Sequence, residues 1–342
     1  MSHFRMRLGS LLLFAAGAHI LGHLAQSWLP SYFVSLLTFM AINSILAVSW
    51  NLVSGFTGQF SLGHAGFMAV GAYTSALLMM KAHWSFLPAL LTGGAAAAAC
   101  GFLVGFPCLR LVGDYLAVVT LGFHYIILAV INNTPNLTGG GLGIVGVPLR
   151  TDLAVALLAL VVTVWLVGNF VYSRHGRCCR AVKEDEIAAQ CLGINTTYYK
   201  LAAFTISSFF AGVGGALTGH FTMYLHPDVF NYLKTVESVT MVILGGLGSL
   251  TGSLLGACAI TALPEVFRNA GTLLHSLGYA AASQWVRSAW MVMYSLLLVL
   301  MMLLRPRGLL GGWEMSWQWA VARLAKRLRA REQGGKGLGS SP

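Results

Sequence analysis

The chain has 342 residues, of which 57% are hydrophobic and only 9% are charged, whereas a soluble domain carries about 25% charged residues. So little charge excludes a soluble enzyme, a disordered chain and a fibrous repeat. A membrane-spanning helix needs about 20 apolar residues, so the composition predicts an all-α polytopic integral membrane protein with about eight to ten transmembrane helices. The 40 glycines fit close packing of such helices and argue against β-barrel strands.

The net charge of +11 is concentrated at the ends of apolar runs rather than spread along the chain. Four cations lie between residues 174 and 183, Arg305 and Arg307 follow a long apolar run, and five more lie between residues 323 and 331. Cytoplasmic loops of membrane proteins carry an excess of Lys and Arg, so these segments are expected in the cytoplasm. The charge therefore indicates a lipid bilayer and no nucleic-acid partner, and the loop 132–151 is expected in the periplasm.

In chain order, apolar runs predict spans at about residues 8–29 and 33–53, followed by a glycine-interrupted stretch that continues to residue 80. Further spans are expected at about 86–109, 115–131 and 153–172, with a glycine-rich loop at 138–146. A basic loop at 173–200 precedes a span at 201–225, a second interrupted stretch at 238–267 and a last span at 289–304. Residues 1–310 are thus expected to form one transmembrane domain, and residues 311–342 a cytoplasmic, amphipathic basic tail with a disordered end.

The number of crossings after the basic loop gives a test of this list. The cations at 174–183 and at 305–307 should lie on the same side, so an even number of crossings must separate them. Only three apolar segments lie between them. Residues 238–267 are therefore expected to re-enter the membrane or to split into two crossings, because glycines interrupt them.

The two interrupted stretches are the best candidates for a transport route, because irregular backbone at membrane depth must face protein or water. The side chains and backbone groups expected to line this route are Gln59, Ser61 and His64 in the first stretch, and Gly245, Gly246, Gly248 and Ser249 in the second. The alternative is that these groups satisfy one another inside the helix bundle.

Several blocks of sequence, in order, resemble one membrane-protein family. They are residues 51–65 (NLVSGFTGQFSLGHA), 110–122 (RLVGDYLAVVTLG), 183–189 (KEDEIAA), 241–249 (MVILGGLGS) and 305–309 (RPRGL). Together they resemble the permease subunit of branched-chain amino-acid ABC transporters, of the LivM type. The chain departs from the family pattern at His124 and Tyr125, where a small residue and a carboxylate are common.

The resemblance implies one subunit of an ATP-driven importer that moves leucine, isoleucine and valine across a bacterial inner membrane. The implied partners are a second permease subunit, two ABC ATPase subunits and a periplasmic amino-acid-binding protein. The same family with another cargo, such as urea, amides or other amino acids, is an alternative. A stand-alone channel or secondary transporter is a more distant one, since secondary transporters usually carry ionisable residues in mid-span and the clear spans here hold almost none.

The chain itself is not expected to be an enzyme or to bind a cofactor. It contains no G-x-x-x-x-G-K-[ST] phosphate-binding loop, so ATP would be bound by the partner ATPases. Its ten carboxylates show no catalytic arrangement, and the six cysteines show neither a disulfide framework nor metal-ligand spacing. His19 and His23 could face the same way on a helix, but without a third ligand polar packing is the favoured interpretation.

The basic loop is the expected contact with an ATPase. Small and apolar residues between Cys178 and Leu192 fall mostly on one helical face, which could enter a groove of a partner subunit, with Gly193 as the helix stop. From periodicity alone a solvated loop is the alternative, and the family resemblance favours the coupling helix. The residues assigned to this coupling loop are Arg177, Glu184, Asp185, Glu186, Ala188, Ala189 and Gly193. Asp114 and Glu237 are interpreted as carboxylates at span edges or in loops, with a place in the transport path as the alternative.

Overall fold

The computed structural model describes residues 2–109, 111 and 113–276, together with residues 295, 296, 299, 303 and 308. Helices dominate this part of the chain, and six of them are long and apolar enough to cross a membrane. The prediction of an all-α polytopic membrane protein is therefore confirmed. The predicted last span at 289–304 and the tail at 311–342 lie outside the described residues, apart from the isolated positions above.

The first five helices follow the apolar runs closely. They are α1 (Ser2–Trp28), α2 (Ser31–Thr57), α3 (His64–Lys81), α4 (Phe86–Cys108) and α5 (Asp114–Asn132). α2 and α3 are separated by the glycine-rich residues 58–63, so the first interrupted stretch is broken as predicted. Asp114 lies in the first turn of α5, at a helix edge as expected.

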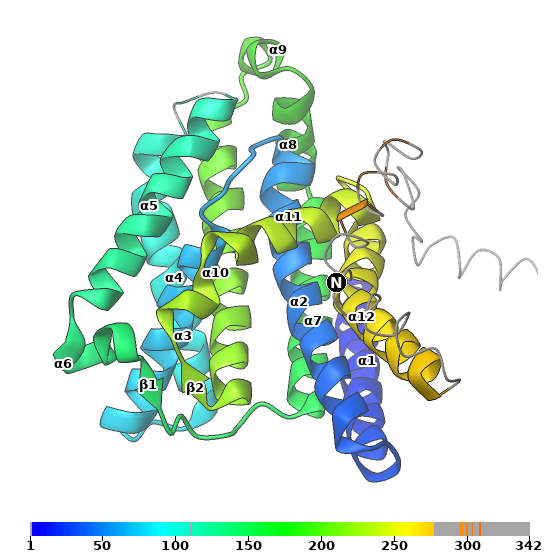
Figure 1. The fold of residues 1–342 in the computed structure, drawn as a ribbon. Helices are drawn as coiled ribbons and strands as arrows, with labels where there is room; N and C mark the ends of the chain where they lie inside the picture. The colour runs from blue at the N-terminus through cyan, green and yellow to red at the C-terminus, as the bar shows by residue number, and fades with distance from the viewer. Residues whose placement is uncertain are drawn as a thin grey trace, which may run out of the picture.

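The glycine-rich loop after α5 folds into short elements at one end of the molecule. They are α6 (Pro135–Thr138), the 3₁₀ helix η1 (Gly140–Leu142) and β1 (Ile144–Val145). β1 pairs antiparallel with β2 (Tyr224–Leu225), with Ile144 opposite Leu225. Figure 1 shows these elements at the lower left, beside the lower ends of the long helices.

The second half of the chain begins with α7 (Leu153–Val171) and the basic loop. The loop contains two helices, α8 (Arg174–Glu184) and α9 (Glu186–Cys191), rather than the single helix expected over 177–193. Asp185 separates them with an extended backbone (φ −156°, ψ 113°) and caps α9 by accepting hydrogen bonds from the amides of Ile187 and Ala188. α8 and α9 lie at the end opposite β1 and β2 (Figure 1).

The remaining elements are α10 (Thr196–Thr222), η2 (Pro227–Phe230), α11 (Tyr232–Gly245) and α12 (Leu250–Ser276). The second interrupted stretch therefore splits into two helices at the glycines that predicted an interruption. α11 has 14 residues and is about 21 Å long at 1.5 Å per residue, too short for a hydrocarbon core of about 30 Å. It is a half-helix that ends at the break before α12.

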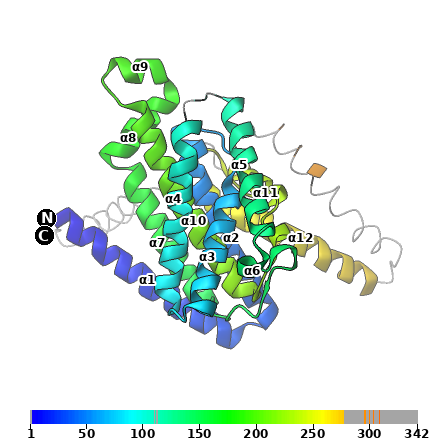
Figure 2. The same ribbon diagram turned by 90° about the vertical axis from the view of Figure 1, so that its left-hand side faces the viewer.

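The core is a close-packed group of helices around α10. α10 packs most extensively against α3 and α4, and α1 and α7 lie against each other on another side (Figure 2). Glycines allow the contacts: a Cβ added to Gly71 would lie 2.2 Å from the carbonyl oxygen of Gly212, and one added to Gly215 would lie 1.9 Å from that of Met68. Small residues therefore hold α3 and α10 at near backbone contact.

Candidate functional site

The break between α2 and α3 is held by side chains of the protein. Gly58 turns the chain with φ of +76°, a left-handed conformation that glycine adopts without strain. The carbonyl oxygen of Ser61 accepts a hydrogen bond from Nε1 of Trp50 at 2.9 Å, and that of Gln59 accepts one from Oγ of Ser54 at 2.8 Å. Both donors lie on α2, so the last turns of this helix fix the path of the break.

The amide groups of the same break are also paired. The amide of Leu62 donates to Oγ1 of Thr120 on α5 at 3.0 Å, and the amide of Ala65 donates to Oγ1 of Thr235 on α11 at 3.1 Å. The break is thus tied to α5 and to the half-helix α11. Most backbone groups freed by the interruption are satisfied by other parts of the chain, as burial at membrane depth requires.

The break between α11 and α12 is held by one amide side chain. Oδ1 of Asn51 accepts a hydrogen bond from the amide of Gly248 at 2.9 Å. Nδ2 of Asn51 donates to the carbonyl oxygen of Ser249 at 2.9 Å and to Oγ of Ser253 at 2.8 Å. A Cβ added to Gly55 would lie 2.5 Å from the amide nitrogen of Gly248, so only glycine permits this approach.

Helix α8 reaches the same place from the basic loop. Nζ of Lys183 donates a hydrogen bond to the carbonyl oxygen of Gly55 at 2.7 Å. The guanidinium of Arg180 lies over the rings of Phe56 and Tyr172, at 5.6 and 5.5 Å from their centroids. We call Asn51, Gly55, Lys183 and Gly248 the break junction. It connects α8 to both interrupted segments within a few ångströms.

The predicted route residues are placed as follows. Gln59, Ser61, His64 and Ser249 are buried. His64 Nε2 lies 3.0 Å from Oγ of Ser49, and Oγ of Ser49 donates to the carbonyl oxygen of Leu46, so the imidazole donates to Ser49. Neither the oxygen nor the nitrogen of the Gln59 side-chain amide has a hydrogen-bond partner among the described residues. Among the predicted route residues, Gln59 thus has a buried polar side chain that is unpaired within the described part of the chain.

Gly245 and Gly246 pack the second break. A Cβ on Gly245 would lie 2.0 Å from the carbonyl oxygen of Gly252 on α12, and one on Gly308 would lie 2.6 Å from Cα of Gly246. Among the route residues, the structure brings Gly248 and Ser249 into contact with α2 beside the first break. Whether the breaks line a permeation path stays a prediction.

The predicted coupling residues divide between the two helices of the loop. Arg177 and Glu184 are exposed on α8, and Asp185 and Gly193 are exposed at the two ends of α9. Glu186 forms an ion pair with Lys200 of α10. Ala189 is 2% exposed and packs within the chain, so it is not available to a partner. Ala188 is exposed, and it lies between Ile187 and Leu192, which are 75% and 80% exposed.

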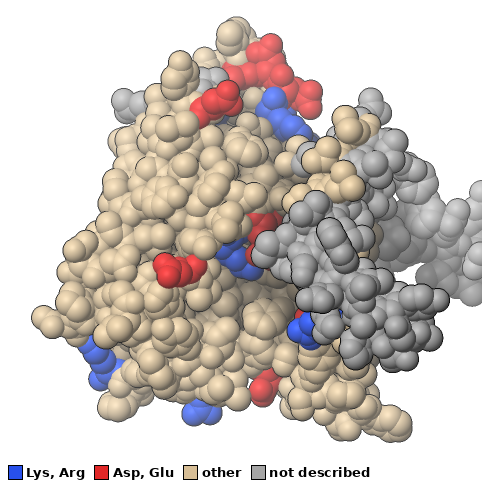
Figure 3. All heavy atoms as spheres, viewed as in Figure 1, with Lys and Arg blue, Asp and Glu red and all other residues tan. Residues whose placement is uncertain are grey.

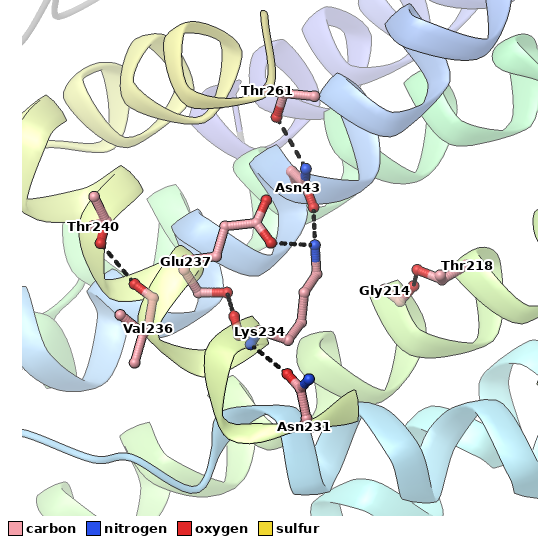
Figure 4. Close-up of polar contacts among 10 residues, drawn as sticks. Asn43, Gly214, Thr218, Asn231, Lys234, Val236, Glu237, Thr240 and Thr261 are labelled. Carbon is pink, nitrogen blue, oxygen red and sulfur yellow. Dashed lines mark hydrogen bonds and ion pairs between the residues drawn. The ribbon is translucent and has the colours of Figure 1, made fainter. Parts of the chain in front are cut away.

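A polar cluster that the sequence analysis missed joins α2, α11 and α12 (Figure 4). Nζ of Lys234 donates to Oε2 of Glu237 at 2.8 Å and to Oδ1 of Asn43 at 3.0 Å. Nδ2 of Asn43 in turn donates to Oγ1 of Thr261 at 2.9 Å. Glu237 therefore lies in a helix, paired with Lys234, and not in a loop. An asparagine inside the apolar run 33–53 was the available signal.

No metal site is found among the residues that the structure describes, where no three His, Cys, Asp or Glu side chains are grouped to hold an ion. The rings of His19 and His23 lie edge to face with centroids 4.6 Å apart.

Comparison with known proteins identifies the family. Residues 32–304 match the family model described as the permease component of branched-chain amino acid transport systems. The chain is 34% identical to the high-affinity branched-chain amino acid transport system permease protein LivM of Salmonella typhimurium, over 81% of this chain and 69% of that protein. It is 35% identical to LivM of Escherichia coli over the same shares.

The chain is also 26% identical to the permease protein LivH of Salmonella typhimurium, over 80% of this chain and 92% of that protein. No solved structure matches the chain. The relatives are transport components and not enzymes. The family model covers most of the chain and agrees with the multi-pass helical fold, and the chain belongs to the family of permease components of branched-chain amino acid transport systems, as a permease subunit of an ABC importer.

Proposed function

We propose that this chain is one of two different permease subunits that carry branched-chain amino acids across the bacterial inner membrane. In this proposal two ATPase subunits bind and hydrolyse ATP on the cytoplasmic side, and a periplasmic protein delivers the amino acid. The chain holds no cofactor of its own. Its basic loop, Arg305, Arg307 and the C-terminus are cytoplasmic, in keeping with the distribution of positive charge.

The break junction is the observation that carries the proposal. Lys183 of α8 bonds to Gly55, and Asn51, one helical turn earlier on α2, bonds to Gly248 and Ser249 of the second break. A movement of α8 would therefore pull on both interrupted segments without any long relay. Such a link is what a permease needs when its energy comes from a separate ATPase.

Helix α9 supports the assignment of the ATPase contact. Ile187 and Leu192 are 75% and 80% exposed at the end of the molecule farthest from the β1–β2 pair (Figure 1). Large apolar side chains that protrude from a charged loop mark a surface for a partner. The surface proposed to enter the ATPase groove is Ile187, Ala188 and Leu192, with Arg177 and Glu184 beside it.

The rival interpretation as a secondary transporter has one observation in its favour. Lys234 bonds to Asn43 in the middle of α2 and to Glu237 on its own helix, and such ionisable residues can couple an ion to transport. They are paired with each other, however, so neither is left as an isolated proton site. ATP-driven transport remains the proposal.

The experiment is leucine uptake by the complete system, with both permeases, both ATPases and the binding protein. We expect uptake into proteoliposomes that requires ATP on the ATPase side and the loaded binding protein on the other. Uptake that follows a proton or sodium gradient without ATP would overturn the ATP-driven assignment. ATP-dependent uptake of urea or an amide but not of leucine, isoleucine or valine would move the cargo to the same-family alternative.

A further inference from the structure

The Lys234–Glu237 pair lies at the depth of the membrane centre. Lys234 contacts Asn43, which is 12 residues after the first residue of α2 and 14 before its last, or about 18 and 21 Å along the axis at 1.5 Å per residue. Asn43 also bonds to Thr261 of α12, 11 residues into that helix. Two full-length helices thus place the pair near the middle of the hydrocarbon layer.

The pair is open on one side. The side chains of Lys234 and Glu237 are 20% and 33% exposed, although they lie beside helices with apolar surfaces. Figure 3 shows that this face is largely covered by uncharged residues, with basic and acidic side chains next to each other near its middle and others toward its ends. Charged groups at this depth do not face lipid. The open side of the pair must therefore face water or another polypeptide.

The cluster offers opposite charges at the spacing of an amino acid's own groups. The Nζ of Lys234 and Oε2 of Glu237 are 2.8 Å apart, and Lys234 points from α11 toward Glu237 and Asn43 (Figure 4). A zwitterion brings one carboxylate and one ammonium on the same carbon. Binding of the zwitterion can replace the Lys234–Glu237 ion pair by two new ion pairs, one between its carboxylate and Lys234 and one between its ammonium and Glu237. Because the zwitterion is neutral, no net charge enters the membrane.

We propose that Lys234 and Glu237 form a zwitterion-binding subsite in the middle of the permeation path, with Asn43 and Thr261 holding Lys234 in place. This inference rests on the proposed function, since it names where the transported amino acid is held. The subsite recognises the α-ammonium and α-carboxylate and does not discriminate between substrate side chains. Its location also assigns the open side of α11 to the path shared with the second permease.

The test removes both charges together. A variant with Lys234→Met and Glu237→Gln leaves no unpaired charge behind, so a pair that only links helices can be replaced in this way without loss of assembly. We expect the complete transporter to assemble and to hydrolyse ATP, while the maximal rate of leucine uptake falls by about tenfold or more. The concentration of loaded binding protein that gives half-maximal uptake should not change, because that protein docks in the periplasm.

The matched control is a second i, i+3 ion pair within the described residues, Glu265 with Arg268 on α12, whose charged atoms are 2.8 Å apart. Glu265→Gln with Arg268→Met should leave uptake near the level of the unmodified protein. If the Lys234/Glu237 double variant also transports leucine at that level, the subsite is refuted and the proposed function stands. If the unmodified transporter moves no leucine at all, the proposed function fails first.

A second variant decides the case if the doubly neutral protein does not assemble. Lys234→Arg keeps a cation opposite Glu237 but replaces the compact ammonium group by a planar guanidinium group. We expect it to assemble and to lower the maximal uptake rate by about threefold or more at an unchanged half-saturating concentration of loaded binding protein. Unchanged maximal uptake in this variant would show that the pair is a structural link only.

Discussion

The Nζ of Lys183 donates a 2.7 Å hydrogen bond to the carbonyl oxygen of Gly55, 128 residues earlier in the chain. Gly55 lies in the last turn of α2, where its missing side chain also admits the backbone of Gly248. One ammonium group on the basic loop is therefore fixed to the point where the two interrupted segments meet. This contact is the physical basis of the coupling that we propose.

Asn51 should be the main stabilising residue of the second break. Asn51→Leu keeps the approximate volume but leaves the amide of Gly248 and the carbonyl of Ser249 without their partner. Each buried unpaired group costs about 1–3 kcal/mol, so the melting temperature of the purified protein should fall by several degrees. Ser253→Ala removes only one of the three bonds made by Asn51 and should have a smaller effect. Equal melting temperatures for Asn51→Leu and the unmodified protein would contradict this role.

The two alanines of α9 should respond differently to a large side chain. Ala188 is exposed, so Ala188→Trp should leave the permease folded in the membrane and reduce the amount of ATPase that copurifies with it. Ala189 is 2% exposed, and overpacking such a site typically costs about 1–3 kcal/mol, so Ala189→Trp should lower the stability of the permease itself. Normal ATPase recovery and normal uptake with Ala188→Trp would show that α9 does not dock.

Two cysteines of the basic loop should report both its side of the membrane and its packing. Cys191 is exposed and should react with a membrane-impermeant maleimide in inside-out vesicles but not in intact spheroplasts. Cys179 is buried, and desolvation, with a smaller effect of Cys178, raises the pKa of its thiol to about 11. Maleimide labelling should be measured on two variants that keep Cys191 or Cys179 as the only cysteine of the chain, and Cys179 should react more slowly because it is buried and its thiol pKa is raised. Labelling of Cys191 from the periplasm would show that the proposed orientation is wrong.

The raised pKa of Cys179 also predicts a pH dependence of stability. Because the folded-state pKa lies above the ordinary thiol pKa of 9.0, the folded state favours the protonated thiol. The stabilisation is complete below about pH 9 and is lost as the pH rises toward 11. Thermal unfolding from pH 8 to pH 11 should show a steeper loss of stability in the unmodified protein than in Cys179→Ala. Parallel curves for the two proteins would contradict the assignment.

The two breaks should become accessible only when the transporter changes state. Ser61 and Ser249 are 4% and 0% exposed here, so cysteines at these positions should be inert to small thiol reagents in this conformation. Reactivity should appear when nucleotide moves the ATPases. If both stay inert in every nucleotide state while Gln59→Ala and His64→Ala transport normally, the breaks are packing elements.

The sequence predicted the helical class, the two interrupted stretches and the split of residues 238–267, because apolar runs and glycine clusters are local signals. It did not predict that Asp185 divides the coupling helix, since an N-cap depends on backbone conformation as well as residue type. The sequence contained Asn43, Asn51 and Lys183, but their partners lie 128 to 218 residues away. Such contacts depend on tertiary packing that periodicity does not encode.

The most direct test of coupling is the amount of ATP hydrolysed per leucine imported by a transporter that carries Lys183→Met. The loss of a hydrogen bond from a charged donor is worth about 1.5–3 kcal/mol, enough to loosen α8 from Gly55 without unfolding the helices. Lys81→Met is the matched control, because Nζ of Lys81 also donates to backbone carbonyls, those of Asn136 and Leu137, at the opposite end of the molecule. We predict that Lys183→Met assembles and hydrolyses ATP but imports little leucine, whereas Lys81→Met keeps the ratio of the unmodified protein. An unchanged ratio for Lys183→Met would contradict the coupling role of the break junction.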